Sequence, residues 1–121
     1  MTVTAGDFSQ GTFVGRIWRP DVQGPAVVML QDGRLRDITS SEIPTMQALL
    51  EKDDPAAVAH AAPGENLGAL DAVLENSIEG AGNFSRPHLL APCDLQAVKA
   101  CGVTFARSMI ERVIEERAAG D

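Results

Sequence analysis

Three side chains near the carboxyl end of the sequence have the types and the spacing of a proton-transfer site. Ser108 and Glu111 are three residues apart, and Glu115 follows four residues later. In a helix this spacing places them on one face. A carboxylate beside a hydroxyl can act as a general base next to a hydrogen-bonding group at the edge of a pocket. The spacing therefore makes Glu111 a catalytic candidate, with Ser108 as its neighbour.

The alternative for the same stretch is an exposed helix surface without a catalytic role. Arg107 stands four residues before Glu111, and Arg112 stands four residues before Glu116. Oppositely charged pairs at this spacing stabilise an exposed helix. The spacing alone favours the exposed surface, and both interpretations stay open at this point.

The remaining residues that carry chemistry form no catalytic or metal-binding pattern. His60 and His88 lack the partner four residues away that a helical metal site needs, and Cys93 and Cys101 lack the second cysteine pair or nearby histidine of a zinc site. We predict surface or packing roles for the histidines, and packing as small hydrophobic side chains for the cysteines. No metal site is predicted within these 121 residues.

Composition and charge exclude several classes of partner. The chain has 10 Lys and Arg residues against 17 Asp and Glu residues. Because the basic residues form no patch, neither nucleic acid nor an anionic membrane is an expected partner.

The opening MTVTAGDFSQ lacks the pattern of a signal peptide, and the longest apolar run, residues 26–30, is too short to span a bilayer. We expect a soluble, cytoplasmic protein with reduced thiols.

The first third of the sequence has the pattern of an antiparallel meander. Residues 12–19 are rich in β-branched and aromatic side chains, residues 26–30 form a short apolar run, and residues 34–38 alternate between polar and apolar. Asp32-Gly33 lies between the last two segments and is a strong hairpin signal, because both residues accept a positive φ. Three consecutive strands are therefore predicted.

Helix signals dominate the middle of the sequence. Ser and Thr at residues 39–41 suggest a helix start, with Pro44 in the first turn, and Asp53-Asp54-Pro55 ends this helix. Asp54 is then expected to cap a second short helix that runs through Ala62. A third helix is predicted over residues 66–76, with four apolar side chains on one face, Leu67, Leu70, Val73 and Leu74.

The last third combines one ambiguous stretch with the clearest helix. Residues 79–86 are expected to form an exposed loop. Residues 97–103 suit either a strand or a helix, and periodicity does not decide between them. Residues 104–118 have the pattern of an amphipathic helix. We therefore predict an α+β domain over residues 12–121, with a small antiparallel β meander, short helices, a further strand and a C-terminal amphipathic helix, after a flexible lead over residues 1–11.

The run at residues 89–116, LLAPCDLQAVKACGVTFARSMIERVIEE, resembles the segment that links the two domains of fumarylacetoacetate hydrolase family enzymes. Many members carry Asn-Tyr-x-x-His-x-x-Glu at the start of a short helix over the active site. In the matching run here, Phe105 stands for the aromatic residue, Ser108 for the His and Glu111 for the Glu. VGRIWRP at residues 14–20 and GPAVV at residues 24–28 resemble the amino-terminal meander of the family's sugar-acid branch, and residues 43–76 resemble its helical insert. The resemblance covers the chain from about Phe13 onward.

The resemblance implies roles for four residues. In the hydrolytic members the His–Glu pair activates water, so Ser108 in place of the His departs from their pattern. A Ser with the Glu retained looks more like the sugar-acid branch, whose members dehydrate or cleave 2-keto-3-deoxy acids. Glu111 would then be the general base or water-positioning group, Ser108 a hydrogen-bonding neighbour, and Arg107 and Arg112 contacts of a substrate carboxylate.

The family's chemistry also requires a divalent cation, usually Mg²⁺. In the family a Glu-x-Glu pair and a later Asp of a large carboxy-terminal β-domain hold the ion, which polarises the keto acid. This sequence has no Glu-x-Glu. We therefore expect an amino-terminal domain or fragment without the metal-binding domain, inactive alone. The parent enzyme would act on a 2-keto or 1,3-diketo acid by hydrolysis, dehydration or C–C cleavage.

The resemblance also favours a strand over residues 97–103, whose apolar face would be exposed. This suggests a second hypothesis, a non-enzymatic interaction domain that docks on a partner chain. A homo-oligomer, or a complex with a separate β-domain, is the expected assembly. A third option is a degenerate fragment without function.

Overall fold

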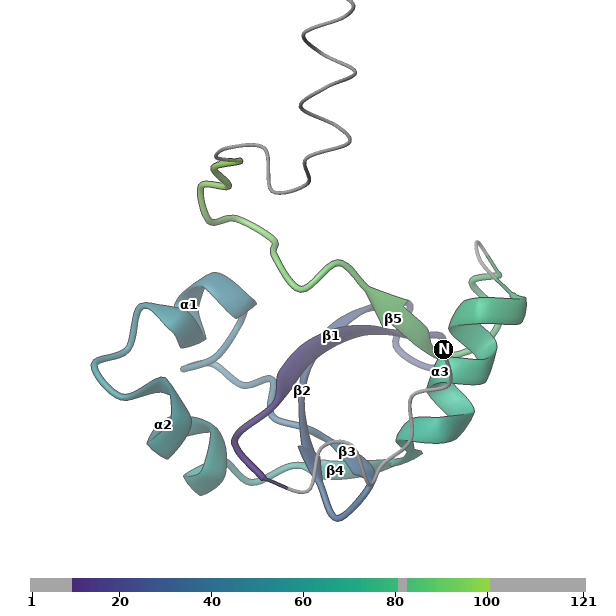
Figure 1. Cartoon of the computed structure of the whole chain (residues 1–121), viewed down its shortest axis with the longest axis horizontal. Coiled ribbons are helices and arrows are strands. Elements are labelled where there is room, and N and C mark those ends of the chain that lie inside the picture. Colours follow the sequence, from purple (N-terminus) through teal and green to yellow (C-terminus); the bar gives the residue numbers. More distant parts are fainter. Residues whose placement is uncertain (1–9, 81–82, 101–121) are drawn as a thin grey trace, which may run out of the picture.

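The computed structural model describes residues 10–80 and 83–100, which form a curved five-stranded antiparallel sheet with helices on both faces (Figure 1). The order of the strands across the sheet is β4-β3-β2-β1-β5. The mixed α+β class predicted from the sequence is confirmed. The strands are β1 (Val14–Arg19), β2 (Gly24–Gln31), β3 (Arg34–Asp37), β4 (Glu65–Ala69) and β5 (His88–Leu90).

The predicted meander is present as β1, β2 and β3. The turn between β2 and β3 is formed by Asp32 and Gly33, with φ of 53° and 74°. Positive φ at both positions is what a two-residue hairpin requires, because its twist then matches that of the strands. The Asp-Gly signal in the sequence therefore located this turn correctly.

The edge strands were not predicted. The helix expected over residues 66–76 is wrong in its first part, because Glu65–Ala69 pairs with β3 as strand β4, and α3 (Leu70–Glu79) begins only after it. The free edge of β3 offers unpaired backbone groups, and pairing with them replaces the hydrogen bonds that a helix would have made. Strand β5 pairs in the same way with the outer edge of β1.

Two short helices follow β3, and each begins with a side-chain cap. Helix α1 (Met46–Leu50) is capped by Thr45, whose hydroxyl accepts from the backbone N–H of Ala48. Helix α2 (Pro55–Ala61) is capped by Asp54 and has Pro55 at its first position, as predicted. Pro44 precedes the cap of α1 and is not in its first turn, because the Thr45 side chain provides the better start.

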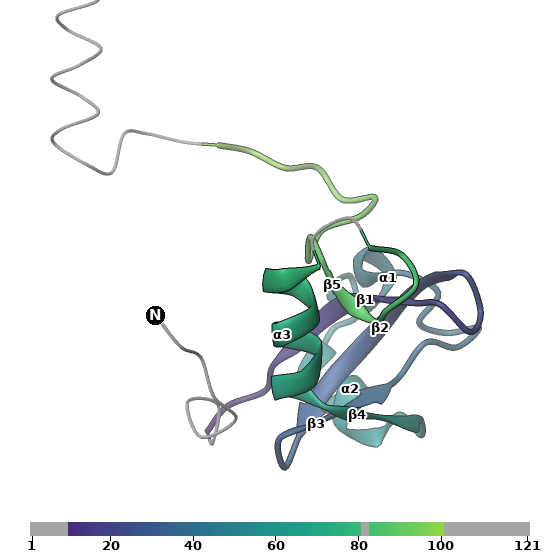
Figure 2. The ribbon, with the colours of Figure 1, turned by 90° about the vertical axis from the view of Figure 1, so that its right-hand side faces the viewer.

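The core has two layers, one on each face of the sheet. Figure 1 shows α1 and α2 on one side of the strands and α3 on the other, and Figure 2 shows the same arrangement after a quarter turn. Consecutive residues of β2 alternate between the layers, so this strand is buried on both faces. The layer towards α1 and α2 contains Val27, Met29, Ile38, Ile43, Met46, Leu49 and Ala59, and the layer towards α3 contains Ile17, Ala26, Val28, Leu35, Leu70 and Val73.

After β5 the chain leaves the sheet without forming another helix or strand up to residue 100 (Figure 2). The strand predicted over residues 97–103 is therefore wrong for residues 97–100, and residues 101–103 lie outside the described part. Val98 is 72% exposed. A strand requires a neighbour for its backbone groups, and no described strand lies beside this segment. The lead over residues 1–9 and the helix predicted over residues 104–118 also lie outside the described residues.

No helix in the described part of the chain has the length and apolar character needed to cross a membrane.

The packing predicts that an alanine substitution lowers the free energy of unfolding much more at one glycine than at another. A Cβ atom on Gly64 would overlap the carbonyl oxygen of Asp37, whereas a Cβ on Gly15 would meet no atom within 4 Å. Gly64→Ala should lower the free energy of unfolding by about 1–3 kcal/mol, because backbone must move to make room. Gly15→Ala is the matched control and should change it by less than about 0.5 kcal/mol. Urea unfolding of both variants measures this, and equal midpoints would contradict the close approach at Gly64.

Candidate functional site

The four residues that sequence reasoning assigned to a site lie outside the described residues. Arg107, Ser108, Glu111 and Arg112 therefore remain predicted site residues whose mutual arrangement is not tested. The described residues show instead how the segment leading to them is attached. This attachment is built around Arg16 of β1 and Asp94.

Arg16 fixes the segment that follows β5. Its Nη1 donates hydrogen bonds to the carbonyl oxygens of Ala91, at 3.1 Å, and Cys93, at 3.2 Å. Its Nε lies 3.5 Å from Oδ2 of Asp94. The Arg16 side chain is 16% exposed and the Asp94 side chain 10%, so these contacts are shielded from most of the solvent. Three groups of the departing chain are thus attached to one guanidinium.

Asp94 extends the attachment to α1. Its Oδ2 accepts from the backbone N–H of Met46 at 2.7 Å, and its Oδ1 accepts from that of Gln47 at 3.0 Å. The first N–H groups of a helix have no partner within it. Because α1 has no acidic residue in its first turn, a carboxylate distant in sequence supplies the missing acceptors. We call these contacts, with those of Arg16, the Arg16–Asp94 cluster.

The environment of Asp94 favours its ionised form. Partial burial by itself opposes ionisation, but the backbone N–H groups of Leu95, Met46 and Gln47 and the charge of Arg16 outweigh it. The pKa of Asp94 is therefore lowered from its ordinary value. The carboxylate is charged at neutral pH and can hold both α1 and Arg16.

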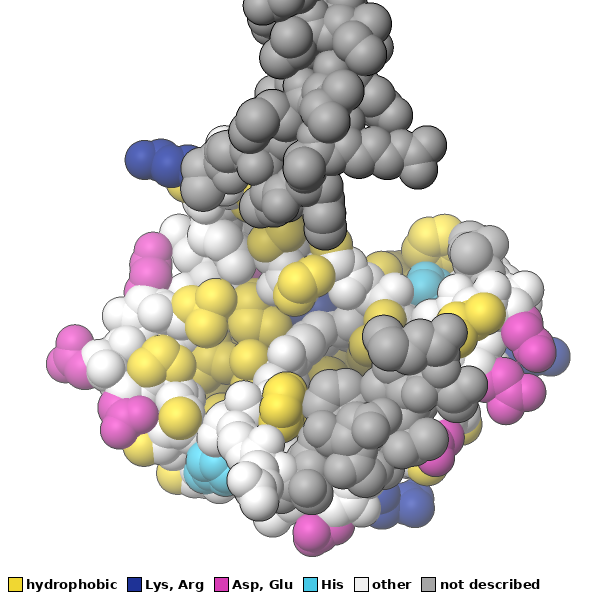
Figure 3. Space-filling view, viewed as in Figure 1, with side chains coloured by type: hydrophobic (Ala, Val, Ile, Leu, Met, Phe, Trp, Pro, Cys, Tyr) yellow, Lys and Arg dark blue, Asp and Glu magenta, His cyan; other side chains and the backbone are white. Residues whose placement is uncertain are grey.

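A small cavity lies beside the Arg16–Asp94 cluster. Its volume is about 170 Å³, and its lining includes Thr45, Asp94 and Leu95. Typical ligand sites measure roughly 300–1,000 Å³. The cavity is therefore small for a substrate site, and the cluster is better described as an attachment of the chain. Figure 3 shows hydrophobic side chains gathered between the two short helices and the strands on this side of the molecule.

A second cluster surrounds Arg19 on the other face of β1. Its Nη1 lies 2.7 Å from Asp37 and its Nη2 3.2 Å from Glu65, and it also pairs with Asp21. Hydrogen bonds to Asp21 and Asp37 raise the pKa of Arg19, and the bond to Arg19 lowers the pKa of Asp21. The neighbouring cleft has a volume of about 400 Å³. Because three carboxylates already neutralise Arg19, this cleft is poorly suited to an anionic substrate.

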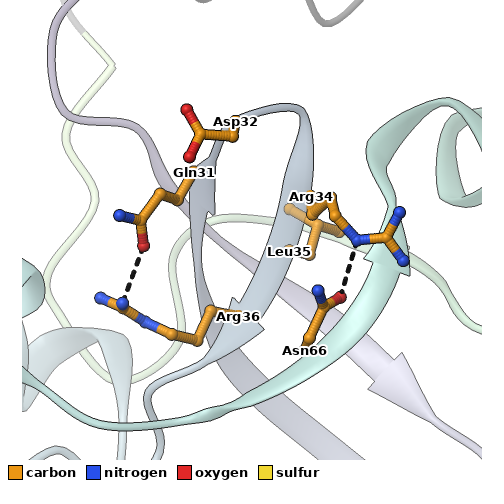
Figure 4. A pocket seen from close by; sticks show the side chains of 6 residues that line it. All are labelled: Gln31, Asp32, Arg34, Leu35, Arg36 and Asn66. Atoms are coloured by element: carbon orange, nitrogen blue, oxygen red, sulfur yellow. Dashed lines mark hydrogen bonds between the residues drawn. The ribbon is translucent and has the colours of Figure 1, made fainter.

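A third pocket lies at the β2–β3 hairpin and contains two arginines that point in different directions (Figure 4). Arg36 donates from Nη1 to Gln31 and from Nη2 to the carbonyl oxygen of Ala59, near the end of α2. Arg34 donates from Nε to Asn66 of β4. Arg36 therefore stabilises the carboxyl end of a helix, and the two guanidinium groups do not converge on a common anion.

The two histidines and the described cysteine differ in their burial. His60 is exposed, with Nε2 at 2.8 Å from Oγ1 of Thr12, whereas His88 is buried against the ring of Phe84. Cys93 is half-buried. Among residues 10–80 and 83–100, no group of three His, Cys, Asp or Glu side chains is placed to hold a metal ion.

We compared the chain with models of protein families, with curated protein sequences and with solved structures, and none of them matches it.

Sequence reasoning did not identify the Arg16–Asp94 cluster. Its two main residues are 78 positions apart, and Asp94 contacts a helix 47 or 48 positions before it. One signal was available, because a helix beginning at Met46 without an acidic residue in its first turn needs acceptors from elsewhere. This signal does not say which carboxylate supplies them.

The lowered pKa of Asp94 predicts how its contribution to stability depends on pH. The unfolded state, with an aspartate pKa of about 3.9, binds more protons here than the folded state does. The stabilisation that ionised Asp94 gives the folded state is therefore complete at pH values above the unfolded-state pKa. It is lost as the pH falls through the lower pKa of the folded state. Asp94→Asn should cost about 1–3 kcal/mol at about pH 6, and the difference from wild type should shrink on acidification. Urea unfolding over a pH series measures it.

Asp53→Asn serves as the control for this experiment, because Asp53 is exposed. It should change the free energy of unfolding at about pH 6 by less than about 0.5 kcal/mol. A pH-independent difference between wild type and Asp94→Asn would contradict the assignment.

Proposed function

We propose that the chain is the amino-terminal part of an enzyme similar to the fumarylacetoacetate hydrolase family, in its sugar-acid branch. The enzyme would act on a 2-keto or 1,3-diketo acid by hydrolysis, dehydration or C–C cleavage. The order of the motifs along the sequence supports this proposal. The observed α+β fold, with its meander of β1, β2 and β3, is compatible with the proposal.

The observation that carries the proposal is the way in which the chain leaves the domain. Residues 91–100 are without helix or strand, and they are attached at one end by the Arg16–Asp94 cluster. Two apolar side chains on this segment, Leu95 and Val98, are 71% and 72% exposed. Apolar side chains exposed on a connecting segment suggest a surface that another folded unit covers. The predicted motif begins at Thr104, four residues after Ala100.

The proposed chemistry assigns proton transfer to this chain. Glu111 is the general base or water-positioning group, and Ser108 donates or accepts a hydrogen bond beside it. Arg107 and Arg112 meet the substrate carboxylate, since guanidinium groups bind carboxylates in a bidentate manner.

The proposal also expects Mg²⁺, which would polarise the keto acid when bound. The described residues offer no group of side chains that fits this ion. The resemblance assigns its ligands to a separate β-domain, and no catalytic step within this chain depends on them. The protein is proposed to be cytoplasmic, where both cysteines would stay reduced.

A second candidate function, an interaction domain without catalysis, is favoured by an apolar groove. The groove has a volume of about 190 Å³ and lies between α3 and the sheet. Two of its side chains, Phe13 and Leu89, are 37% and 38% exposed. Size-exclusion chromatography separates the candidates, because docking predicts a homo-oligomer or a stable complex with a separate β-domain. A monomer that binds no such domain would argue against docking.

The enzyme proposal predicts a defined pattern of activity. The pure 121-residue chain with Mg²⁺ should turn over neither acylpyruvates nor 2-keto-3-deoxy sugar acids. The chain joined to, or mixed with, a β-domain that carries Glu-x-Glu should turn over one of them. In that assembly Glu111→Gln should lower kcat by about 10²–10⁴-fold, because it removes the general base. Steady-state kinetics measures this.

Glu116→Gln is the matched control, a change of the same type five residues away, and should leave kcat within about twofold of wild type. Turnover by the pure chain, or full activity of Glu111→Gln in the assembly, would refute the proposal.

A further inference from the structure

We propose that the apolar groove between α3 and the sheet receives the ring of Phe8, from the amino-terminal segment of the same chain. This inference goes beyond the proposed function and does not depend on it. In the protein by itself, residues 1–9 then cover the surface that a docking partner needs, so a partner has to displace them.

The groove exists because β1 carries a glycine where the strand faces α3. Gly15 pairs with Val28, and residues directly opposite in an antiparallel pair lie on the same face of a sheet. Val28 belongs to the layer towards α3, so a side chain at position 15 would point into that layer. A Cβ atom on Gly15 would meet no atom within 4 Å. The missing side chain therefore leaves space beside α3.

The lining of the groove suits a single aromatic ring. Val28, Leu35 and Leu70 line it and are buried, whereas Leu89 also lines it and is 38% exposed. None of the described lining residues carries a charge, and the volume is about 190 Å³. An apolar cavity of about 150 Å³ is large enough to bind benzene. The groove therefore has room for one phenyl ring, with apolar side chains around it.

The described chain begins beside the same groove. A Cβ atom on Gly11 would lie 3.4 Å from Cε2 of Phe13, whose ring lines the groove. The backbone of Phe13 is held against β2, because its carbonyl oxygen accepts from the N–H of Leu30 at 2.9 Å. Phe8 is three residues before Gly11, and such a length of chain spans at most about 10–11 Å. The ring of Phe8 is therefore within reach of the groove.

Phe8 is the side chain of this segment that gains most from docking. The segment MTVTAGDFS contains one aromatic residue and neither Leu nor Ile. A phenylalanine side chain removes more apolar area from water than a valine or an alanine does. Because only a few residues join Phe8 to the groove, its docking closes a short loop and costs less entropy than the binding of a separate molecule. The chain itself therefore supplies the favoured occupant.

NMR spectroscopy of the isotope-labelled 121-residue chain tests the contact directly. Nuclear Overhauser effects should join the ring protons of Phe8 to methyl groups of Leu74 and Leu89, which line the groove. In a mixture of labelled and unlabelled chains, these effects should arise within one molecule only. Their absence from the wild type would overturn the proposal, and their appearance between two molecules would identify a second copy as the occupant instead.

Removing the ring should open the groove to a small apolar probe. Phe8→Ala should bind benzene at least about tenfold more tightly than wild type, because the groove is then no longer occupied. Shifts of the Leu74 and Leu89 methyl signals measure this binding. Phe84→Ala is the matched control, since Phe84 is 57% exposed and packs against Trp18, and it should bind benzene as wild type does. Equal affinity of wild type and Phe8→Ala would show that Phe8 leaves the groove open, and would overturn the proposal.

Filling the groove from the strand tests the site independently of Phe8. Gly15→Leu places a side chain in the space beside Val28 and should abolish the effects between Phe8 and Leu74. Unchanged signals of Ile17, in the adjoining core layer, show that the variant is folded. Persistence of the Phe8 effects in folded Gly15→Leu would place the ring elsewhere and overturn the assignment. If Gly15→Leu does not fold, the benzene affinities of Phe8→Ala and wild type decide.

Discussion

The burial of β2 on both of its faces is the constraint on which the rest of the structure depends. Ala26, Val27, Val28 and Met29 are all buried, and alternate residues of a strand point to opposite sides. Neither side can therefore be left to solvent without exposing apolar surface. The pair of short helices covers one side and α3 covers the other. The positions of β1 and β3 follow, because each pairs with β2 along its length.

The fixed position of β1 gives its two arginines different roles. Arg16 lies opposite Val27, whose side chain belongs to the layer beneath α1 and α2. Arg19 has the opposite parity in the strand and meets carboxylates from β3 and β4. Arg19 therefore joins neighbouring strands of the domain. Arg16 joins the domain to the chain that leaves it.

This division connects the fold to the proposed function. The described residues contain an ordered scaffold and an attached exit segment, and the residues of the predicted catalytic motif come after that segment. In the proposed enzyme, the domain would present these residues from the end of that segment. The acidic cleft near Arg19 and the hairpin pocket do not provide an alternative anion site, because their arginines are bound to carboxylates, amides or carbonyl oxygens.

Local signals in the sequence were sufficient for some elements. The Asp32-Gly33 turn, the three strands around it and the start of α2 at Asp54-Pro55 were predicted and are observed. The strand β4 was predicted as a helix, because Leu67 and Leu70 have helical spacing with Val73 and Leu74. In the structure, residues 65–69 pair instead with the edge of β3. The strand expected over residues 97–103 does not form over its described part, since it has no neighbour.

The sequence by itself determined the α+β class, the central hairpin and the Asp54 cap of α2, because each depends on residues close together in the chain. It also supplied the proposed family motif around Ser108 and Glu111. Only the tertiary structure decided which segments form the edges of the sheet. It also decided that Asp94 caps α1, which is far from it in sequence, and pairs with Arg16. Such contacts depend on distances in space, which local residue patterns do not encode.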